Sequence, residues 1–104
     1  MGNNLFSIKT TLPNSWREFE VVYLAQELLE NGAACIHHHQ ITSTYKWEGE
    51  IHSENEWSVE INVSHSNKDS VLSKLRTIHP YDVPQIICME LEADDSYYKW
   101  VDSQ

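Results

Sequence analysis

The segment AACIHHHQ, residues 33–40, places three consecutive histidines two positions after a cysteine. Thiolate and imidazole groups together suit copper or zinc. β-Branched and aromatic residues dominate the stretch that follows, which predicts a strand, and side chains alternate across a strand. Cys35, His37 and His39 should therefore share one face, about 7 Å apart along the strand. Zinc lies about 2.0–2.3 Å from its ligand atoms, so a metal ion at this column needs a further ligand from another strand or subunit.

Two other interpretations of the histidines stay open. They can hydrogen-bond within an interface or face solvent. They can also form a pH-sensitive contact, because histidine titrates near neutrality. Cys88 and His79 are further candidate ligands, but the sequence does not place them beside the column.

A second group of candidate residues surrounds HPYDVP, residues 79–84. Its two prolines predict a rigid corner between a helix and a strand. The same corner could form the wall of a cleft, since Tyr81 supplies a hydroxyl donor and Asp82 a carboxylate. Tyr45 and Trp47 fall on one face of their strand and could line that cleft, or could simply pack in an interface. The candidate ligand cleft comprises Tyr45, Trp47, His79, Tyr81 and Asp82.

The composition argues against several classes of partner. Sixteen acidic residues outweigh seven basic ones, which gives a net charge of −9. A phosphate backbone needs a basic face, so neither nucleic acid nor an anionic membrane is an expected partner. No apolar run approaches the length of a membrane span. The opening residues 1–13 are too short and too polar for a secretory signal, so we expect a cytoplasmic location.

The residue types also argue against an enzyme. Cys35 begins an apolar strand, where a thiol is usually inert, and the three glycines form no phosphate loop. The acidic run WEGEIHSENE, residues 47–56, lacks the spaced oxygen ligands and fixed glycine of a calcium loop. We therefore interpret its acidic residues as solvated side chains of a hairpin tip: Glu48, Glu50, Glu54 and Glu56.

The elements that position these residues follow from hydrophobic periodicity. Residues 5–12 alternate, which predicts a strand. Residues 14–32 carry apolar side chains at helical intervals, with Asn14 or Ser15 as the cap and Glu18 at capping-box spacing from Ser15. A long hairpin, a second helix, a strand and a short terminal helix follow over residues 33–63, 66–80, 85–91 and 94–104. The hairpin is expected to break near Gly49.

The predicted order is therefore βαββαβ followed by a short helix. This is the α+β, ferredoxin-like sandwich, in which four antiparallel strands carry both helices on one face. A chain of 104 residues is expected to form a single domain, residues 1–104. The many aromatic residues in so small a domain favour covering the other face with a further subunit.

Three segments, ELLENGAACIH, STYKWEGEI and IHPYDVPQII, together resemble the CutA family of divalent-cation tolerance proteins, in matching order and spacing over roughly residues 5–101. The resemblance implies a homotrimer in which the long hairpin reaches a neighbouring subunit. It also implies a shape similar to the PII signalling proteins, which bind small ligands in clefts between subunits.

The function implied by the resemblance is binding of copper or another divalent metal ion and tolerance of that ion, with the metal as the sole cofactor and no catalysis. One alternative is a PII-like trimer that senses a small organic or nucleotide ligand, without a physiological metal. Another is a trimer that acts as a scaffold for other proteins. The chain departs from the family pattern at Gln85, where the family often has Glu, and at its histidine run.

Overall fold

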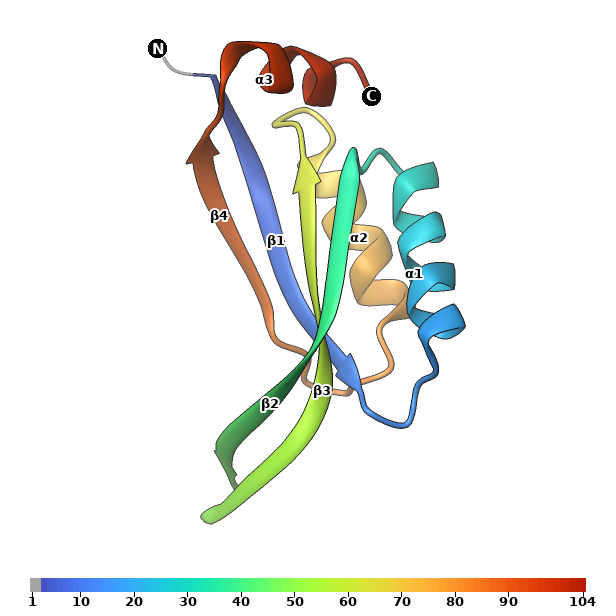
Figure 1. Ribbon diagram of the computed structural model, residues 1–104, viewed down its shortest axis with the longest axis vertical. Helices are drawn as coiled ribbons and strands as arrows, with labels where there is room; N and C mark the ends of the chain where they lie inside the picture. Colours follow the sequence, from blue (N-terminus) through green and yellow to red (C-terminus); the bar gives the residue numbers. More distant parts are fainter. Residues whose placement is uncertain (1–2) are drawn as a thin grey trace.

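The computed structural model describes residues 3–104 of the chain (Figure 1). In chain order the elements are β1 (Asn4–Pro13), α1 (Glu18–Glu30), β2 (Cys35–Trp47), β3 (Glu50–Val63), α2 (Lys68–Ile78), β4 (Ile86–Glu92) and α3 (Asp95–Asp102). This order confirms the predicted βαββαβ pattern and its terminal helix. The expectation for the opening residues falls partly on Met1 and Gly2, which lie outside the described residues.

The four strands form one antiparallel sheet in the order β2-β3-β1-β4. Helices α1 and α2 lie side by side on one face of this sheet, as Figure 1 shows. The two central strands are β1 and β3, so β2 and β4 form the edges. The arrangement confirms the ferredoxin-like α+β class, whereas the homotrimer stays a prediction.

The core lies between α1, α2 and the sheet face that they cover. Trp57, Val59, Ile61 and Val63 of β3 are all buried, because alternate side chains of a strand point to the same face. The helices bury apolar residues at helical spacing against them: Val21, Leu24, Leu28, Val71 and Leu75. Each such side chain contributes about 1.5–3 kcal/mol when it is buried, so this layer fixes which face of every strand points inward.

The opposite side of the sheet, here called the open face, is partly covered by α3. Val101 of this helix is buried, and the Tyr97 hydroxyl accepts a hydrogen bond from the Asn62 amide nitrogen at 2.9 Å. Along the edge strand β4, three apolar side chains of the open face expose 40–43% of their surface: Ile87, Met89 and Leu91. Such an exposed apolar strip is typical of a surface that another protein covers.

The start of α1 differs from the prediction. The expected cap at Asn14 or Ser15 was wrong, because the chain between Pro13 and Arg17 is used for a turn, in which the Trp16 N–H donates to the Pro13 carbonyl. The helix begins at Glu18, with Arg17 as its N-cap. The Glu20 carboxylate then accepts from the Arg17 backbone N–H at 2.9 Å. The glutamate half of a capping box therefore exists, two residues later than expected, without the reciprocal bond because an arginine side chain has no acceptor.

The hairpin of β2 and β3 extends beyond the end of the neighbouring strand β1. Its pairing ends at Trp47 and Glu50, so Glu48 and Gly49 form a two-residue turn. Their φ angles of 50° and 82° are those favoured in such turns. Among the described strands, β1 pairs with β3 only as far as Glu56. Residues 42–55 therefore extend beyond the sheet as a two-stranded ribbon, and the predicted break at Gly49 is confirmed (Figure 1).

Candidate functional site

The structure brings two members of the predicted metal column together. The Cys35 sulfur lies 3.6 Å from Nε2 of His37. Both residues point to the open face, because they oppose Asn62 and Glu60, and the inward-facing Ile61 lies between those two. His39 follows on the same face as an exposed side chain opposite Ser58. Cys35 and His37 thus form a thiol–imidazole pair on the edge strand β2.

Within residues 3–104, no three histidine, cysteine, aspartate or glutamate side chains lie close enough to hold one metal ion. The two further candidates are remote from the pair. Cys88 opposes Ile8 and so belongs to the helix-covered face of the sheet. His79 contacts Thr10 on that same face. Any additional ligand for a metal at Cys35 and His37 would therefore have to come from solvent or from a second molecule.

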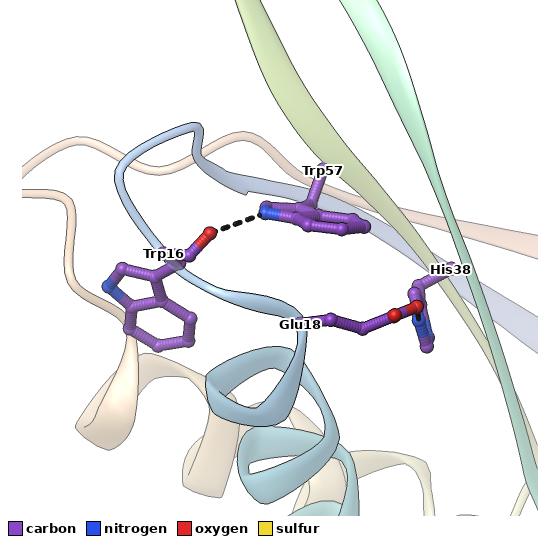
Figure 2. Close-up of polar contacts among 4 residues, drawn as sticks. All are labelled: Trp16, Glu18, His38 and Trp57. Atoms are coloured by element: carbon purple, nitrogen blue, oxygen red, sulfur yellow. Dashed lines mark hydrogen bonds and ion pairs between the residues drawn. The ribbon is translucent and has the colours of Figure 1, made fainter.

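His38 points the other way, into a contact between β2 and the start of α1 (Figure 2). Its Nε2 lies 2.8 Å from the Glu18 carboxylate, and its ring meets the Trp57 ring edge-on with centroids 5.8 Å apart. The Trp57 indole N–H donates to the Trp16 carbonyl at 3.0 Å. This contact was not predicted from the sequence, although strand alternation gives His38 and Ile36 the face opposite to Cys35 and His37, which in the structure is the helix side. Of the three histidines, His38 is therefore the one with a structural role.

A hollow of about 1040 Å³ lies where the ribbon leaves the sheet. Its walls come from the end of β1, the ribbon strands and the corner before β4. Four of the five predicted cleft residues line it: Tyr45, Trp47, Tyr81 and Asp82. The sequence placed these residues on one strand face and one corner, and the fold of a single chain brings the two groups to the same place.

Two tyrosine–glutamate pairs border the hollow: Tyr81–Glu56 joins the corner to the ribbon, and Tyr45–Glu54 joins the two strands of the ribbon. The Tyr81 hydroxyl donates to the Glu56 carboxylate at 2.5 Å, and the Tyr45 hydroxyl donates to the Glu54 carboxylate. Burial, followed by the bond to Glu56, raises the pKa of Tyr81 well above its usual value. The bond to Glu54 is the main cause that raises the pKa of Tyr45. Both phenols therefore remain donors over the physiological pH range.

Glu54 and Glu56 both line the hollow. Glu54 is exposed, as expected of a solvated hairpin residue, whereas Glu56 at the base of the ribbon is partly buried; the sequence did not predict that each accepts a bond from a tyrosine. The register of the hairpin could have predicted the pairing of Tyr45 with Glu54. A two-residue turn at Glu48 and Gly49 makes Ser43 oppose Glu54, so Tyr45 and Glu54 are diagonal neighbours on one face.

His79 lies behind the corner and does not line the hollow. Its Nδ1 accepts from the Tyr81 backbone N–H at 3.1 Å, which leaves the proton of a neutral ring on Nε2. That nitrogen lies 2.8 Å from the Thr10 hydroxyl. Burial lowers the pKa of His79 despite the nearby Glu56 carboxylate. The histidine thus serves as a brace for Tyr81, which matches the rigid corner expected from the two prolines.

The chain is similar in sequence to proteins of a known family. Residues 8–104 match the family model described as the CutA1 divalent ion tolerance protein. The chain belongs to this family. The divalent-cation tolerance protein CutA of Thermotoga maritima is 29% identical over 96 residues, which cover 90% of this chain and 92% of that protein.

Solved structures agree with this assignment. The CutA1 crystal structure from Ehrlichia chaffeensis is 32% identical, covers 99% of this chain and 95% of that one, and has a TM-score of 0.84. A PII-like protein CutA from Nostoc sp. PCC 7120 shares the fold, with 24% identity, a TM-score of 0.79 and coverage of 93% and 92% of the two chains. The family name describes tolerance of divalent ions rather than a reaction. No helix among residues 3–104 has the length and apolar character needed to cross a membrane.

Proposed function

We propose that this CutA-family protein binds copper or another divalent metal ion and contributes to tolerance of that ion in the cytoplasm, without catalysing a reaction. The observation that carries the proposal is the contact between Cys35 and His37, at 3.6 Å from sulfur to nitrogen. A thiolate and an imidazole side by side favour copper and zinc over hard cations such as magnesium. His39 continues the same column.

The proposed site is completed by self-association. Two side chains from one molecule leave a tetrahedral zinc or copper site open. The pair lies on the open face of an edge strand, where a neighbouring molecule can approach. The exposed apolar strip of β4 on the same face supports a homotrimer as the state that contributes the remaining ligands.

Calorimetry with copper(II) and zinc(II) tests the metal site. The variant Cys35→Ala/His37→Ala/His39→Ala should lose at least roughly tenfold in affinity, because removal of first ligands or of their partners commonly costs that much or more. A matched control, Cys88→Ala/His52→Ala/His65→Ala, removes the same residue types elsewhere and should bind like the parent. Equal affinities of the two variants would refute the site. Sedimentation equilibrium should give three times the chain mass of 12.1 kDa for all three proteins.

A second candidate function is favoured by the hollow at the ribbon. Its volume of about 1040 Å³ is that of a small-molecule site. Aromatic rings and hydrogen-bonding side chains from three parts of the chain converge on it. A PII-like module that senses a small ligand is therefore the alternative, and its ligand would bind independently of Cys35 and His37.

A further inference from the structure

The charge of the hollow restricts which small molecule it can take. Three carboxylates line it, those of Glu54, Glu56 and Asp82, and none of its lining residues is a lysine, arginine or histidine. A phosphate or nucleotide needs basic side chains or a helix N-terminus for its charge. An anionic ligand would meet repulsion here, and a cation would meet attraction.

The aromatic residues narrow the choice further. Tyr45, Trp47 and Tyr81 line the same hollow, and Trp47 leaves 52% of its surface exposed. Tryptophan has the ring that attracts cations best, and a cation within about 6 Å of a ring centroid gains from this contact. Exposed rings beside carboxylates form the usual recognition surface for ammonium groups that carry apolar substituents.

The tyrosine–glutamate pairs prepare the carboxylates for such a ligand. Each phenol occupies one oxygen, Oε1 of Glu54 and Oε2 of Glu56. A carboxylate has a second oxygen that can accept from an ammonium N–H. Because the phenols already orient these carboxylates, less side-chain freedom is lost when a ligand binds.

The same geometry disfavours a chelated metal ion in the hollow. No cluster of three metal-ligating side chains occurs among residues 3–104, so the three carboxylates do not converge on one point. An organic cation spreads its contacts over rings and carboxylates and does not require convergence. We propose that the hollow binds a small organic ammonium ion. This inference rests on the second candidate function, a small-ligand module, and not on the metal proposal.

The two proposed sites can be tested separately because they lie far apart. Ser43, where the wall of the hollow begins, lies eight positions along β2 from Cys35 and four from His39. At the usual rise of a strand these separations are roughly 26 Å and 13 Å. Variants of the hollow should therefore leave copper binding unchanged, and variants of the cysteine–histidine column should leave ammonium binding unchanged.

Nuclear magnetic resonance of the tryptophan indole N–H groups provides the test. Titration with choline or spermidine should shift the Trp47 signal, whereas ATP and ethylene glycol should not. Calorimetry measures the variants that lack this signal: Trp47→Leu should weaken choline binding roughly fivefold or more, and Trp47→Phe should weaken it less because a ring remains. Glu54→Gln/Glu56→Gln keeps the shape and hydrogen bonding of the walls but should also weaken binding, since it removes two negative charges.

Matched controls use equivalent residues elsewhere on the surface. Trp100→Leu removes a tryptophan on α3 that is 45% exposed, and Glu30→Gln/Glu92→Gln removes two exposed carboxylates. Both variants should bind choline like the parent. ATP or ethylene glycol binding at Trp47 in preference to choline would overturn the ammonium assignment and leave the small-ligand module standing. Displacement of choline by magnesium alone, with no effect of Trp47→Leu, would overturn it as well. No shift of the Trp47 signal with any probe would refute both the ammonium assignment and the small-ligand module.

Discussion

The Tyr81 hydroxyl donates a 2.5 Å hydrogen bond to the Glu56 carboxylate and thereby links the corner before β4 to the base of the ribbon. These residues are 25 positions apart in the chain. Tyr81 is half-buried, and its backbone N–H is held at the same time by His79. Tyr81 therefore joins the corner to the ribbon, while His79, through Thr10, joins the same corner to β1.

Replacing Tyr81 by phenylalanine should destabilise the protein by about 1–2 kcal/mol, because a partly buried carboxylate loses its donor. Chemical denaturation of parent and variant measures this difference. Tyr23→Phe removes a hydroxyl from a side chain that is 67% exposed and should change the free energy of unfolding little. Equal stabilities of the two variants would contradict the role given to the Tyr81–Glu56 bond.

The same bond predicts the response to alkaline pH. The pKa of Tyr81 is raised in the folded protein above its ordinary value of 10.0. Above pH 10 the unfolded chain therefore loses the phenolic proton while the folded protein keeps it. This contribution to stability is complete below pH 10 and is lost as the pH rises towards the folded-state pKa. Tyr81→Phe should show a smaller loss of stability than the parent between pH 9 and 11.

His79 predicts a loss of stability on the acidic side. Burial lowers its pKa below the ordinary value of 6.5, so just under that pH the unfolded chain binds a proton that the folded protein does not. Stability present above pH 6.5 should decline as the pH falls through the folded-state pKa. His79→Asn keeps an acceptor for the Tyr81 N–H and does not titrate, so its thermal midpoint should depend less on pH between 7.5 and 5.5. His65→Asn, at an exposed site, should retain the parental slope.

The contact in Figure 2 predicts unequal effects of two substitutions. Trp57→Phe removes the donor to the Trp16 carbonyl and leaves space in the core, so it should cost about 1–3 kcal/mol. Glu18→Gln weakens an ion pair whose glutamate side chain is 67% exposed, and exposed pairs contribute about 1 kcal/mol or less. Urea unfolding measures both. A larger loss for Glu18→Gln would show that the ion pair, rather than the indole, anchors α1 to the sheet.

Two glycines with positive φ provide a comparison of backbone strain with crowding. A Cβ on Gly32, at φ 109°, would lie 2.9 Å from Asn67 Cβ, whereas a Cβ on Gly49, at φ 82°, would meet no atom within 4 Å. Gly32→Ala should therefore cost roughly 1–3 kcal/mol, which is the range for a strained backbone residue. Gly49→Ala should cost less. Thermal unfolding of the two variants ranks them, and the reverse order would contradict this account.

The sequence was sufficient for the fold because each element has a clear period. The strict alternation of residues 56–63 and the helical spacing of residues 21–29 leave few arrangements that bury all the apolar side chains. The start of α1 was misplaced because Ser15 and Glu18 have the spacing of a cap as well as Arg17 and Glu20 do. Only the turn that follows Pro13 decides between them.

The candidate site was predictable in part. Tyr45, Trp47 and Tyr81 follow from alternation and from the two prolines, but the partners of the tyrosines do not. Glu54 and Glu56 lie in a run of acidic residues, and composition alone gives every member of such a run the same role. Which of them pairs with a phenol depends on the exact residues of the turn, and this fixes the register of the whole ribbon.

The ribbon imposes a rule of parity on any change in its length. Side chains of β2 face alternate sides of the ribbon. Tyr45 and Trp47 lie four and six residues after Ile41, so they share its face, which is also the face of its partner Glu56 at the hollow. One residue inserted between Ile41 and Tyr45 would turn both rings outwards, while two would keep them on the same side. Natural or engineered lengthening of this segment should therefore tolerate steps of two and reject steps of one.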